Sequence, residues 1–335
     1  MAYITTDNLT VIMAEMTDYC NAACPLCQRY DWNLNLSETV NKNHTTLQFV
    51  KERIGNNIIA QLDKWMCQGT YGDATMNPET VEIFSYLREV NPNIRIEMWS
   101  NGGARDAQFW QRMAELKVNV IFGIDGLEDT NHLYRRNVKW SHLIRNVKSF
   151  IDNGGKATWS FLIFKHNQHQ VQEAKQLSKQ IGFTHFESNF SERWQDFNSA
   201  GEYRDIETIT VDDYKLEKPE QPKDFIKHTG DVVLSKNTMH EETDDFLSKK
   251  IQCDSCLPRK KQIYLRANGY VSPCCFLGDV EVNEPKNIIN DYKQINLNYT
   301  SLQEILDGEF FFDLYQGING SEKRLRSCYN MCGVN

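Results

Sequence analysis

The sequence lacks the features of a membrane or secreted protein. No apolar run approaches the roughly 20 residues that span a bilayer. The first residues, MAYITTDNLT, contain no basic segment followed by an apolar one, so they do not resemble a signal peptide. Disorder is not expected either, because 40% of the 335 residues are hydrophobic, which is enough for a large core. We therefore expect a globular cytoplasmic protein with no membrane partner.

An excess of positive charge is also absent. The formal net charge is -8 and the sequence pI is about 5.6. A chain with this balance is poorly suited to wholesale binding of a phosphate backbone. We therefore expect no nucleic acid among its partners.

Cysteine is missing from the middle of the chain and concentrated towards its two ends. The sequence has 10 cysteines, and none lies between Cys67 and Cys253. A reducing cytosol keeps ordinary cysteine pairs reduced, so clustered thiols are better candidates for metal ligands or catalytic groups than for disulfides. Cys67 stands alone and is expected to be a core residue.

The cysteine-free middle alternates between apolar strands and amphipathic helices. After a buried strand expected at 9–16, residues 45–65 carry apolar side chains at helical spacing. Further strands are expected before Gly72 and at 95–100, 118–125, 157–164 and 184–190. About six β-α units of this kind form a parallel sheet covered by helices. Because a closed barrel needs eight units, we predict an α/β fold, a partial (β/α)6 TIM-like barrel with its chemistry at the carboxyl ends of the strands.

Cys20, Cys24 and Cys27 directly follow the first expected strand with the spacing C-x3-C-x2-C. In a 4Fe-4S cluster, three protein thiolates leave one iron open to another ligand. A structural zinc site takes four ligands, and the segment YCNAACPLCQRY offers no histidine as the fourth. We interpret the triplet as the ligands of a catalytic cluster, and a zinc site or three buried thiols are the alternatives.

The triplet and three further segments resemble the motifs of the radical S-adenosylmethionine (SAM) enzymes, in which C-x3-C-x2-C follows the first barrel strand. YGDATMNPE (71–79) is similar to the Gly-Gly-Glu segment of that family, WSNGG (99–103) to its Thr-Asn-Gly segment, and GIDGLEDTNHLYRR (123–136) to its Ser-x-Asp-Gly stretch. The resemblance implies that a 4Fe-4S cluster cleaves SAM to a 5'-deoxyadenosyl radical. It also implies contacts to SAM from Leu26, Gly72, Asp73, Ser100, Asn101, Asp125 and Arg135.

The types of these residues suit the ligand. The methionyl part of SAM presents an ammonium group, for which Asp73 is a partner, and a carboxylate, which Arg135 can bind through two hydrogen bonds. Gly72 permits close approach of the backbone to a ligand, and Ser100 and Asn101 offer hydrogen bonds to the ribose or amino acid portion. Taken singly, Asp73 could instead cap the helix expected to start near Pro78, and Arg135 could be a solvated surface charge.

Two positions depart from the family pattern. Leu26 stands before the third cysteine, where the family usually has an aromatic residue, although a leucine can still pack on adenine. Gly123 replaces the serine of Ser-x-Asp-Gly. This change removes one hydroxyl ligand for SAM and leaves more of the binding to Arg135.

The C-terminal segment contains more thiols than a four-thiolate site needs. The stretch KKQIYLRANGYVSPCC alternates around Asn268-Gly269, which favours a two-residue hairpin turn that returns Cys274 towards Cys256. The spacing C-x12-G-x4-C resembles the auxiliary-cluster extension known as SPASM, or its shorter twitch form. A structural zinc site is the alternative. The resemblance implies one auxiliary 4Fe-4S cluster held by Cys253, Cys256, Cys274 and Cys332, with Cys328 as the competitor for the last position.

We therefore expect three regions along the chain. A radical SAM barrel occupies 1–190, a polar insertion or linker 191–250, and a SPASM- or twitch-like domain, built from a β-hairpin plus a helix, 251–335. The expected partners are a substrate and an electron donor such as flavodoxin or ferredoxin. The non-enzymatic alternatives are an iron-sulfur electron carrier and a zinc-stabilised binding module, neither of which needs a barrel or SAM-binding residues.

The substrate is expected from the resemblance alone. SPASM-type relatives often act on peptides, so the first expectation is modification of a peptide or protein side chain, with the auxiliary cluster oxidising the substrate radical or binding the substrate. The second is dehydrogenation or rearrangement of a small molecule, an aminocyclitol or a nucleotide, as in twitch-type relatives. About 10 residues precede the first expected strand, too few for the separate leader-peptide-binding domain of some peptide-modifying relatives, which counts against a peptide.

Overall fold

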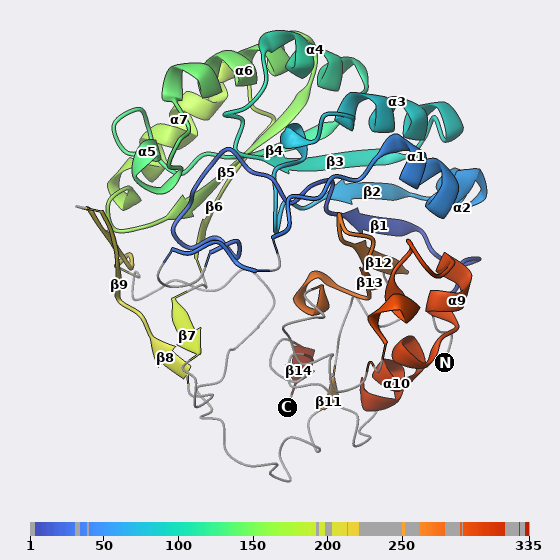
Figure 1. Ribbon diagram of the computed structural model, residues 1–335. Coiled ribbons are helices and arrows are strands. Elements are labelled where there is room, and N and C mark those ends of the chain that lie inside the picture. Colours follow the sequence, from blue (N-terminus) through green and yellow to red (C-terminus); the bar gives the residue numbers. More distant parts are fainter. Residues whose placement is uncertain are drawn as a thin grey trace.

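The computed structural model describes residues 4–30, 34–38, 40–191, 194–197, 203–212, 214–220, 250–251, 261–278, 289, 291–318, 328 and 332–334. Six parallel strands form one sheet in chain order, which confirms the predicted partial barrel (Figure 1). Within the described part of the chain the sheet is open and does not close into a barrel. The strands are β1 (Val11–Ala14), β2 (Lys64–Cys67), β3 (Arg95–Ser100), β4 (Asn119–Gly123), β5 (Lys156–Ile163) and β6 (His185–Phe190).

Helices lie on the convex side of this sheet (Figure 1). The helix expected over 45–65 is divided into α1 (Leu47–Phe49), a turn of π-helix (Val50–Ile54) and α2 (Gly55–Gln61). The division coincides with Gly55, whose φ of 77° is a conformation that glycine adopts readily. The other helices of the barrel are α3 (Thr80–Val90), α4 (Ala107–Glu115), α5 (Asn131–Tyr134), α6 (Trp140–Asp152) and α7 (Val171–Ile181).

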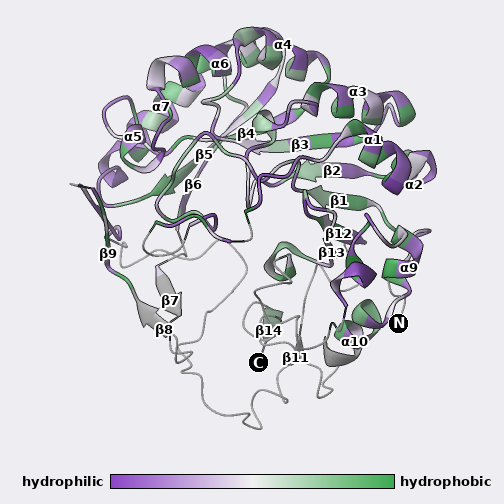
Figure 2. Ribbon diagram, in the orientation of Figure 1, coloured by the Kyte–Doolittle hydropathy of each residue, from purple (hydrophilic) through white to green (hydrophobic). Residues whose placement is uncertain are grey.

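The two faces of the sheet differ in burial. Phe122 on β4 packs against Trp110 of α4 and Phe150 of α6, so this face of the strands points towards the helices. Its neighbours Ile121 and Gly123 point to the opposite, concave face. Figure 2 shows the same division, with hydrophilic residues on the outer sides of the helices and hydrophobic residues along the strands. The sequence predicts this arrangement because helices cover a parallel sheet through its apolar side chains.

The C-terminal segment extends the barrel sheet at its first strand. Strand β12 (Gln262–Leu265) pairs in parallel with β1, and β13 (Val271–Ser272) pairs antiparallel with β12. Their turn is wider than the two-residue turn expected from Asn268-Gly269: Arg266 N donates to Tyr270 O (2.8 Å), and Gly269, at a φ of 94°, donates to Arg266 O (2.9 Å). The helices α9 (Leu302–Leu306) and α10 (Glu309–Ile318) follow. The sheet therefore joins residues on both sides of the boundary expected at 251.

The described part of region 191–250 contains short strand pairs. Strand β7 (Gln195–Phe197) pairs with β8 (Tyr203–Asp205), and β9 (Thr208–Val211) pairs with β10 (Tyr214–Glu217). A third pair joins β11 (Lys250–Ile251) to β14 (Gly333–Val334). The β9–β10 hairpin contacts the barrel, because Lys165 forms an ion pair with Glu217 (3.1 Å) and Arg136 forms one with Asp212.

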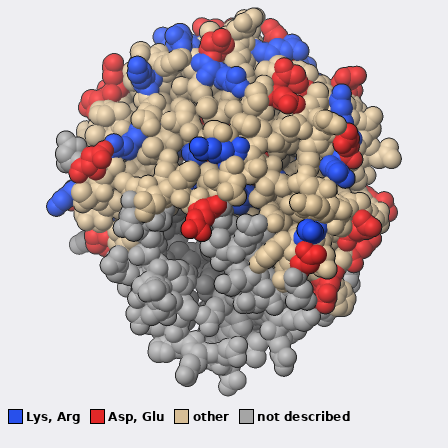
Figure 3. Space-filling view, in the orientation of Figure 1, with Lys and Arg blue, Asp and Glu red and all other residues tan. Residues whose placement is uncertain are grey.

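Helix length and the distribution of surface charge can be described for part of the molecule. None of the described helices combines the length and the apolar composition needed to cross a bilayer. On the face drawn in Figure 3, lysine and arginine side chains are interspersed with aspartate and glutamate side chains. This face therefore presents no extended basic patch among the residues that the structure describes.

Candidate active site

The cysteine triplet lies on the loop that leaves the carboxyl end of β1. Cys24 is buried, and Cys20 and Cys27 are half-buried. The loop is held on one side by Tyr19, whose ring stacks on His44 with ring centroids 4.8 Å apart. His44 in turn shares a 2.9 Å hydrogen bond with Thr17. The triplet therefore lies at the edge of the sheet formed by the carboxyl ends of the strands, where the sequence predicts the active site.

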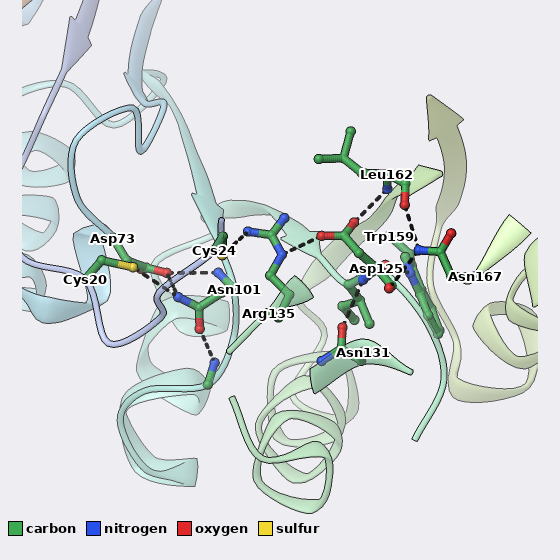
Figure 4. A network of polar contacts seen from close by, with 12 residues as sticks. Cys20, Cys24, Asp73, Asn101, Asp125, Asn131, Arg135, Trp159, Leu162 and Asn167 are labelled. Carbon is green, nitrogen blue, oxygen red and sulfur yellow. Dashed lines mark hydrogen bonds and ion pairs between the residues drawn. The ribbon is translucent and has the colours of Figure 1, made fainter. Parts of the chain in front are cut away.

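Polar groups from other strand ends approach the sulfur atoms. The side-chain amide of Asn101, just after β3, lies 3.6 Å from Cys20 Sγ and donates to it. Arg135 Nη1, beyond β4, donates to Cys24 Sγ over 3.7 Å, and Ala22 N donates to Cys20 Sγ over 3.4 Å. Figure 4 shows how these groups converge. Hydrogen bonds to sulfur are typical of thiolates that ligate iron, because they stabilise the negative charge of the ligand.

The three thiols are electrostatically coupled. Burial raises the pKa of Cys20, and the charges of Asp73, Cys24 and Cys27 raise it further. Burial also raises the pKa of Cys24, to about 11, although Arg135 opposes the shift. Thiolates at Cys20 and Cys24 would therefore need positive charge close by, which the irons of a cluster would provide.

In the described residues, no group of three or more His, Cys, Asp or Glu side chains surrounds a common point at which a metal ion could be held.

Asp73 joins three segments of the site. One carboxylate oxygen accepts from the Thr75 backbone N–H (3.0 Å) and hydroxyl (2.6 Å), so Asp73 caps the short helical turn Ala74–Met76. It does not cap the helix expected near Pro78, because α3 begins at Thr80 with Glu79 at its N-cap. The other oxygen accepts from the Ser100 hydroxyl (2.9 Å), the Asn101 backbone N–H (2.9 Å) and the Asn101 side-chain amide (2.8 Å), and so fixes both residues beside Cys20.

Gly72 is packed where only glycine fits. A Cβ at this position would lie 2.0 Å from Thr17 O and 2.7 Å from Tyr19 O, both of which are backbone atoms. The backbone of the 71–79 segment therefore lies directly against the start of the cysteine loop. The close approach seen here is to the chain's own backbone, whereas the sequence predicts an approach to a ligand at Gly72, and that approach stays a prediction.

Arg135 is an internal ion-pair partner rather than a solvated charge. Its Nε donates to Asp125 Oδ2 over 2.6 Å, and the Asp125 carboxylate is completely buried. Asp125 is held in turn by the Leu162 N–H, which donates to Oδ1 over 2.6 Å. Burial opposes the charge of Arg135, but Asp125 and Cys24 outweigh it and keep the pKa of the guanidinium above its ordinary value. A partly buried, charged guanidinium beside the thiols is suited to a carboxylate ligand.

The structure explains the glycine at position 123. A Cβ on Gly123 would lie 2.3 Å from Arg135 Nη2. The guanidinium therefore occupies the space that a serine side chain would need. Leu26, the other departure from the family pattern, is buried in the core with 4% of its surface exposed.

The C-terminal cysteines are only partly placed. Cys253 and Cys256 lie outside the described residues. Cys274 is buried just after β13, Cys328 is also buried, and Cys332 is half-buried. Cys67 is buried in the barrel core, as expected. The ligand set of the auxiliary site therefore stays a prediction.

Asn21 also belongs to the site, although the sequence did not predict it. Asn21 forms a reciprocal pair with Asn101, donating to Asn101 Oδ1 (3.2 Å) and accepting from Asn101 Nδ2 (2.9 Å). This pair fixes the cysteine loop to the end of β3. Its position between two cysteines is the only signal in the sequence, because the partner lies 80 residues away.

These features define an iron-sulfur enzyme built on a partial α/β barrel, and comparison with known families agrees. The family model of the radical SAM superfamily matches residues 14–177, and that of the SPASM iron-sulfur cluster-binding domain matches residues 253–333. The chain belongs to the radical SAM superfamily and carries a C-terminal SPASM domain. It is therefore a radical SAM enzyme that uses SAM and a 4Fe-4S cluster, with a second region for an auxiliary iron-sulfur cluster.

Several solved structures share this fold. Streptococcus suis SuiB bound to S-adenosylmethionine is 13% identical, with a TM-score of 0.55 over 97% of this chain and 72% of that chain. SuiB bound to its precursor peptide SuiA is 12% identical, with a TM-score of 0.55 over 97% of this chain and 71% of that chain. Native anSMEcpe with AdoMet and the Cp18Cys peptide is 13% identical, with a TM-score of 0.56 over 97% of this chain and 88% of that chain. No curated protein sequence matches the chain significantly.

Proposed function

We propose that this radical SAM enzyme modifies a side chain of a peptide or protein. In this proposal Cys20, Cys24 and Cys27 hold the catalytic cluster. The observation that carries the assignment is the convergence on their sulfur atoms of Asn101 and Arg135, which come from the ends of two different strands. When bound, the cluster and SAM supply the one-electron chemistry that removes a hydrogen atom from the substrate.

The protein's part is to bind and orient SAM. Arg135, fixed by Asp125, binds the methionyl carboxylate, and the segment at Gly72 and Asp73 receives the ammonium group. Ser100 and Asn101, whose side chains donate hydrogen bonds to Asp73, are the other polar residues of the proposed SAM site. Leu26 and Asp125 belong to the same proposed site. The low exposure of these groups keeps water from competing for the ligand.

A peptide substrate is supported by the relatives of similar fold. SuiB has been solved with the precursor peptide SuiA, and anSMEcpe with peptides. The SPASM region supports a role for an auxiliary cluster, which accepts an electron from the substrate radical or binds the substrate. We propose that this cluster is held by Cys253, Cys256, Cys274 and Cys332, with Cys328 as the competitor, and that a flavodoxin or ferredoxin supplies electrons.

Iron counting and SAM cleavage test the proposed sites. We expect the anaerobically purified protein to hold about eight irons, and Cys24→Ala and Cys274→Ala to lose about four each. With a chemical reductant, the wild type and Cys274→Ala should form 5'-deoxyadenosine from SAM, whereas Cys24→Ala should form none. Zinc in place of iron, or loaded clusters without SAM cleavage, would contradict the assignment.

Peptide modification needs a separate test. The reduced enzyme and SAM are incubated with a peptide library, and mass spectrometry identifies peptides that have lost hydrogen or gained a cross-link. Cys67→Ala, which alters a buried thiol of the core, is the matched control for a cysteine substitution. SAM cleavage that no peptide stimulates, and no change in any peptide mass, would refute the peptide assignment while leaving the enzyme class intact.

A further inference from the structure

Arg266 extends from the C-terminal segment towards the residues around the SAM-binding site. It lies immediately after β12, and only 2% of its surface is exposed. Since β12 pairs with β1, the end of β12 lies beside the start of the cysteine loop. The guanidinium contacts three segments that are distant in sequence.

The first contact is with the cysteine loop. Arg266 Nη2 lies 3.7 Å from Asp18 Oδ1, and the Asp18 side chain is completely buried. Asp18 is fixed at its other oxygen by the Asn43 side-chain amide (2.8 Å) and at its carbonyl by Arg29 (3.0 Å). The 3.7 Å separation exceeds hydrogen-bonding distance, so the contact is an ion pair between two buried charges that water screens poorly. Asp18 stands two residues before Cys20.

The second contact is with the segment that carries Gly72. The guanidinium lies over the ring of Tyr71, 3.7 Å from the ring centroid, which is close for a cation–π contact. Tyr71 is itself fixed, because its N–H donates to the buried carboxylate of Glu15 over 3.1 Å. Arg266 therefore contacts the residue next to Gly72.

The third contact is with the turn after Cys274. Arg266 Nη1 donates to Gly278 O over 3.2 Å. Gly278 ends the short helical turn Cys275–Leu277 and is packed on Tyr264, since a Cβ there would lie 2.3 Å from the tyrosine ring. A movement of Cys274 is thus passed to Arg266 through a tightly packed turn.

We propose that Arg266 is a positioning residue that couples the auxiliary-cluster turn to the SAM-binding site. Its three contacts lie in a buried environment, where the charge is poorly screened and each contact affects the other two. Loss of the Cys274 ligand shifts the Gly278 carbonyl, and Arg266 passes the shift to Asp18 and Tyr71. The affinity for SAM therefore depends on the state of the auxiliary site. This inference rests on the proposed ligand roles of Cys20, Cys24, Cys27 and Cys274.

A double-mutant cycle tests the coupling. SAM affinity is measured by calorimetry on the anaerobically reconstituted wild type, Cys274→Ala, Arg266→Met and the double variant. We expect each single variant to bind SAM about fivefold more weakly or worse, and the double variant to bind no more weakly than the weaker single variant. Arg266→Lys, which keeps the charge, should recover part of the affinity. Single effects that multiply in the double variant, or unchanged affinity of Arg266→Met, would overturn the proposal.

A control separates positioning from general stability. Arg88 also binds backbone carbonyls, those of Pro92, Ile94 and Leu116, but on the helical side of the barrel. In hydrogen–deuterium exchange without clusters, Arg266→Met should speed exchange at residues 15–30 and 69–75, and Arg88→Met should not. Equal acceleration in both variants would mean that Arg266 only stabilises the fold, which contradicts the proposal. A wild type that binds neither iron nor SAM would refute the proposed function instead, and the exchange measurement would still test these contacts.

Discussion

Two residues of the site, Gly123 and Arg135, constrain each other because they compete for the same volume. Gly123 and Arg135 are 12 positions apart in the sequence, yet the guanidinium occupies the volume next to the glycine Cα. The ion pair with Asp125 and the contact with Cys24 hold the guanidinium there. The absence of a side chain at 123 therefore belongs to the proposed SAM-binding arrangement, because it leaves room for the guanidinium of Arg135.

Gly123→Ala should displace Arg135. The added methyl group cannot coexist with Nη2 at 2.3 Å, so the arginine loses its contact with Asp125 or the strand shifts. We expect the affinity for SAM to fall about 10-fold or more, which corresponds to loss of a charge-assisted hydrogen bond. Calorimetric titration of the reconstituted enzyme measures this. Adding Gly123→Ala to Arg135→Ala should cost no further affinity, and an additional loss would show that the methyl group acts elsewhere.

At the scale of secondary-structure elements, the packing of the β9–β10 hairpin against the barrel involves His166, whose ring is expected to be uncharged at neutral pH. The His166 ring lies just beyond β5, stacks on Phe164 and meets the edge of Tyr214 on β10, with ring centroids 5.6 and 5.8 Å away. Neither ring nitrogen has a hydrogen-bond partner, and both are shielded from solvent. Burial, together with smaller effects of the neighbouring His169 and His132, lowers the pKa of His166 to about 4. Protonation would place an unpaired charge between the barrel and the hairpin.

Acidification should therefore destabilise the protein through His166. Its folded-state pKa lies below the unfolded value near 6.5, so the unfolded state binds the proton first and stability falls from about pH 6.5 down to about pH 4. Urea denaturation at pH 7 and pH 5 measures the free energy of unfolding. His166→Leu should lose less stability between these values than the wild type. His185→Leu, an exposed position on β6, is the control for removal of a histidine. An equal loss in the wild type and His166→Leu would contradict this interpretation.

At the scale of the whole molecule, the C-terminal segment completes the sheet. Strand β12 covers the edge of β1, and Ile263 and Leu265 are completely buried, which stabilises the fold by about 1.5–3 kcal/mol for each side chain. Without β12, the backbone of β1 would be an exposed edge next to the cysteine loop. The barrel and the described part of the SPASM region therefore share one core.

Truncation tests this dependence. A chain ending at residue 250 loses β12 and β13 and should aggregate, because the apolar edge of β1 becomes accessible. A chain ending at residue 318 keeps β12, β13, α9 and α10 and should remain monomeric. Size-exclusion chromatography with light scattering distinguishes the two outcomes. A monomeric 1–250 fragment would show that the barrel folds independently.

The sequence by itself determined the features that depend on local order. Apolar stretches and helical patterns predicted the six parallel strands and most of the barrel helices, because strands covered by helices are apolar and each helix must bury one apolar face. The cysteine spacing and the segments after three strands predicted the edge at which the site forms, because parallel strands bring their carboxyl ends together. The residues of these segments are close together in the sequence, so short motifs are enough to identify them.

Only the tertiary structure decided the contacts between distant segments. The pairing of β12 with β1, the reciprocal amides of Asn21 and Asn101, and the position of Arg266 over Tyr71 join residues with no common local pattern. The same holds for Gly123, whose meaning depends on where a later arginine is placed. A sequence motif specifies which groups are available, whereas packing decides which of them meet, because burial energies depend on partners that the chain brings together only when it folds.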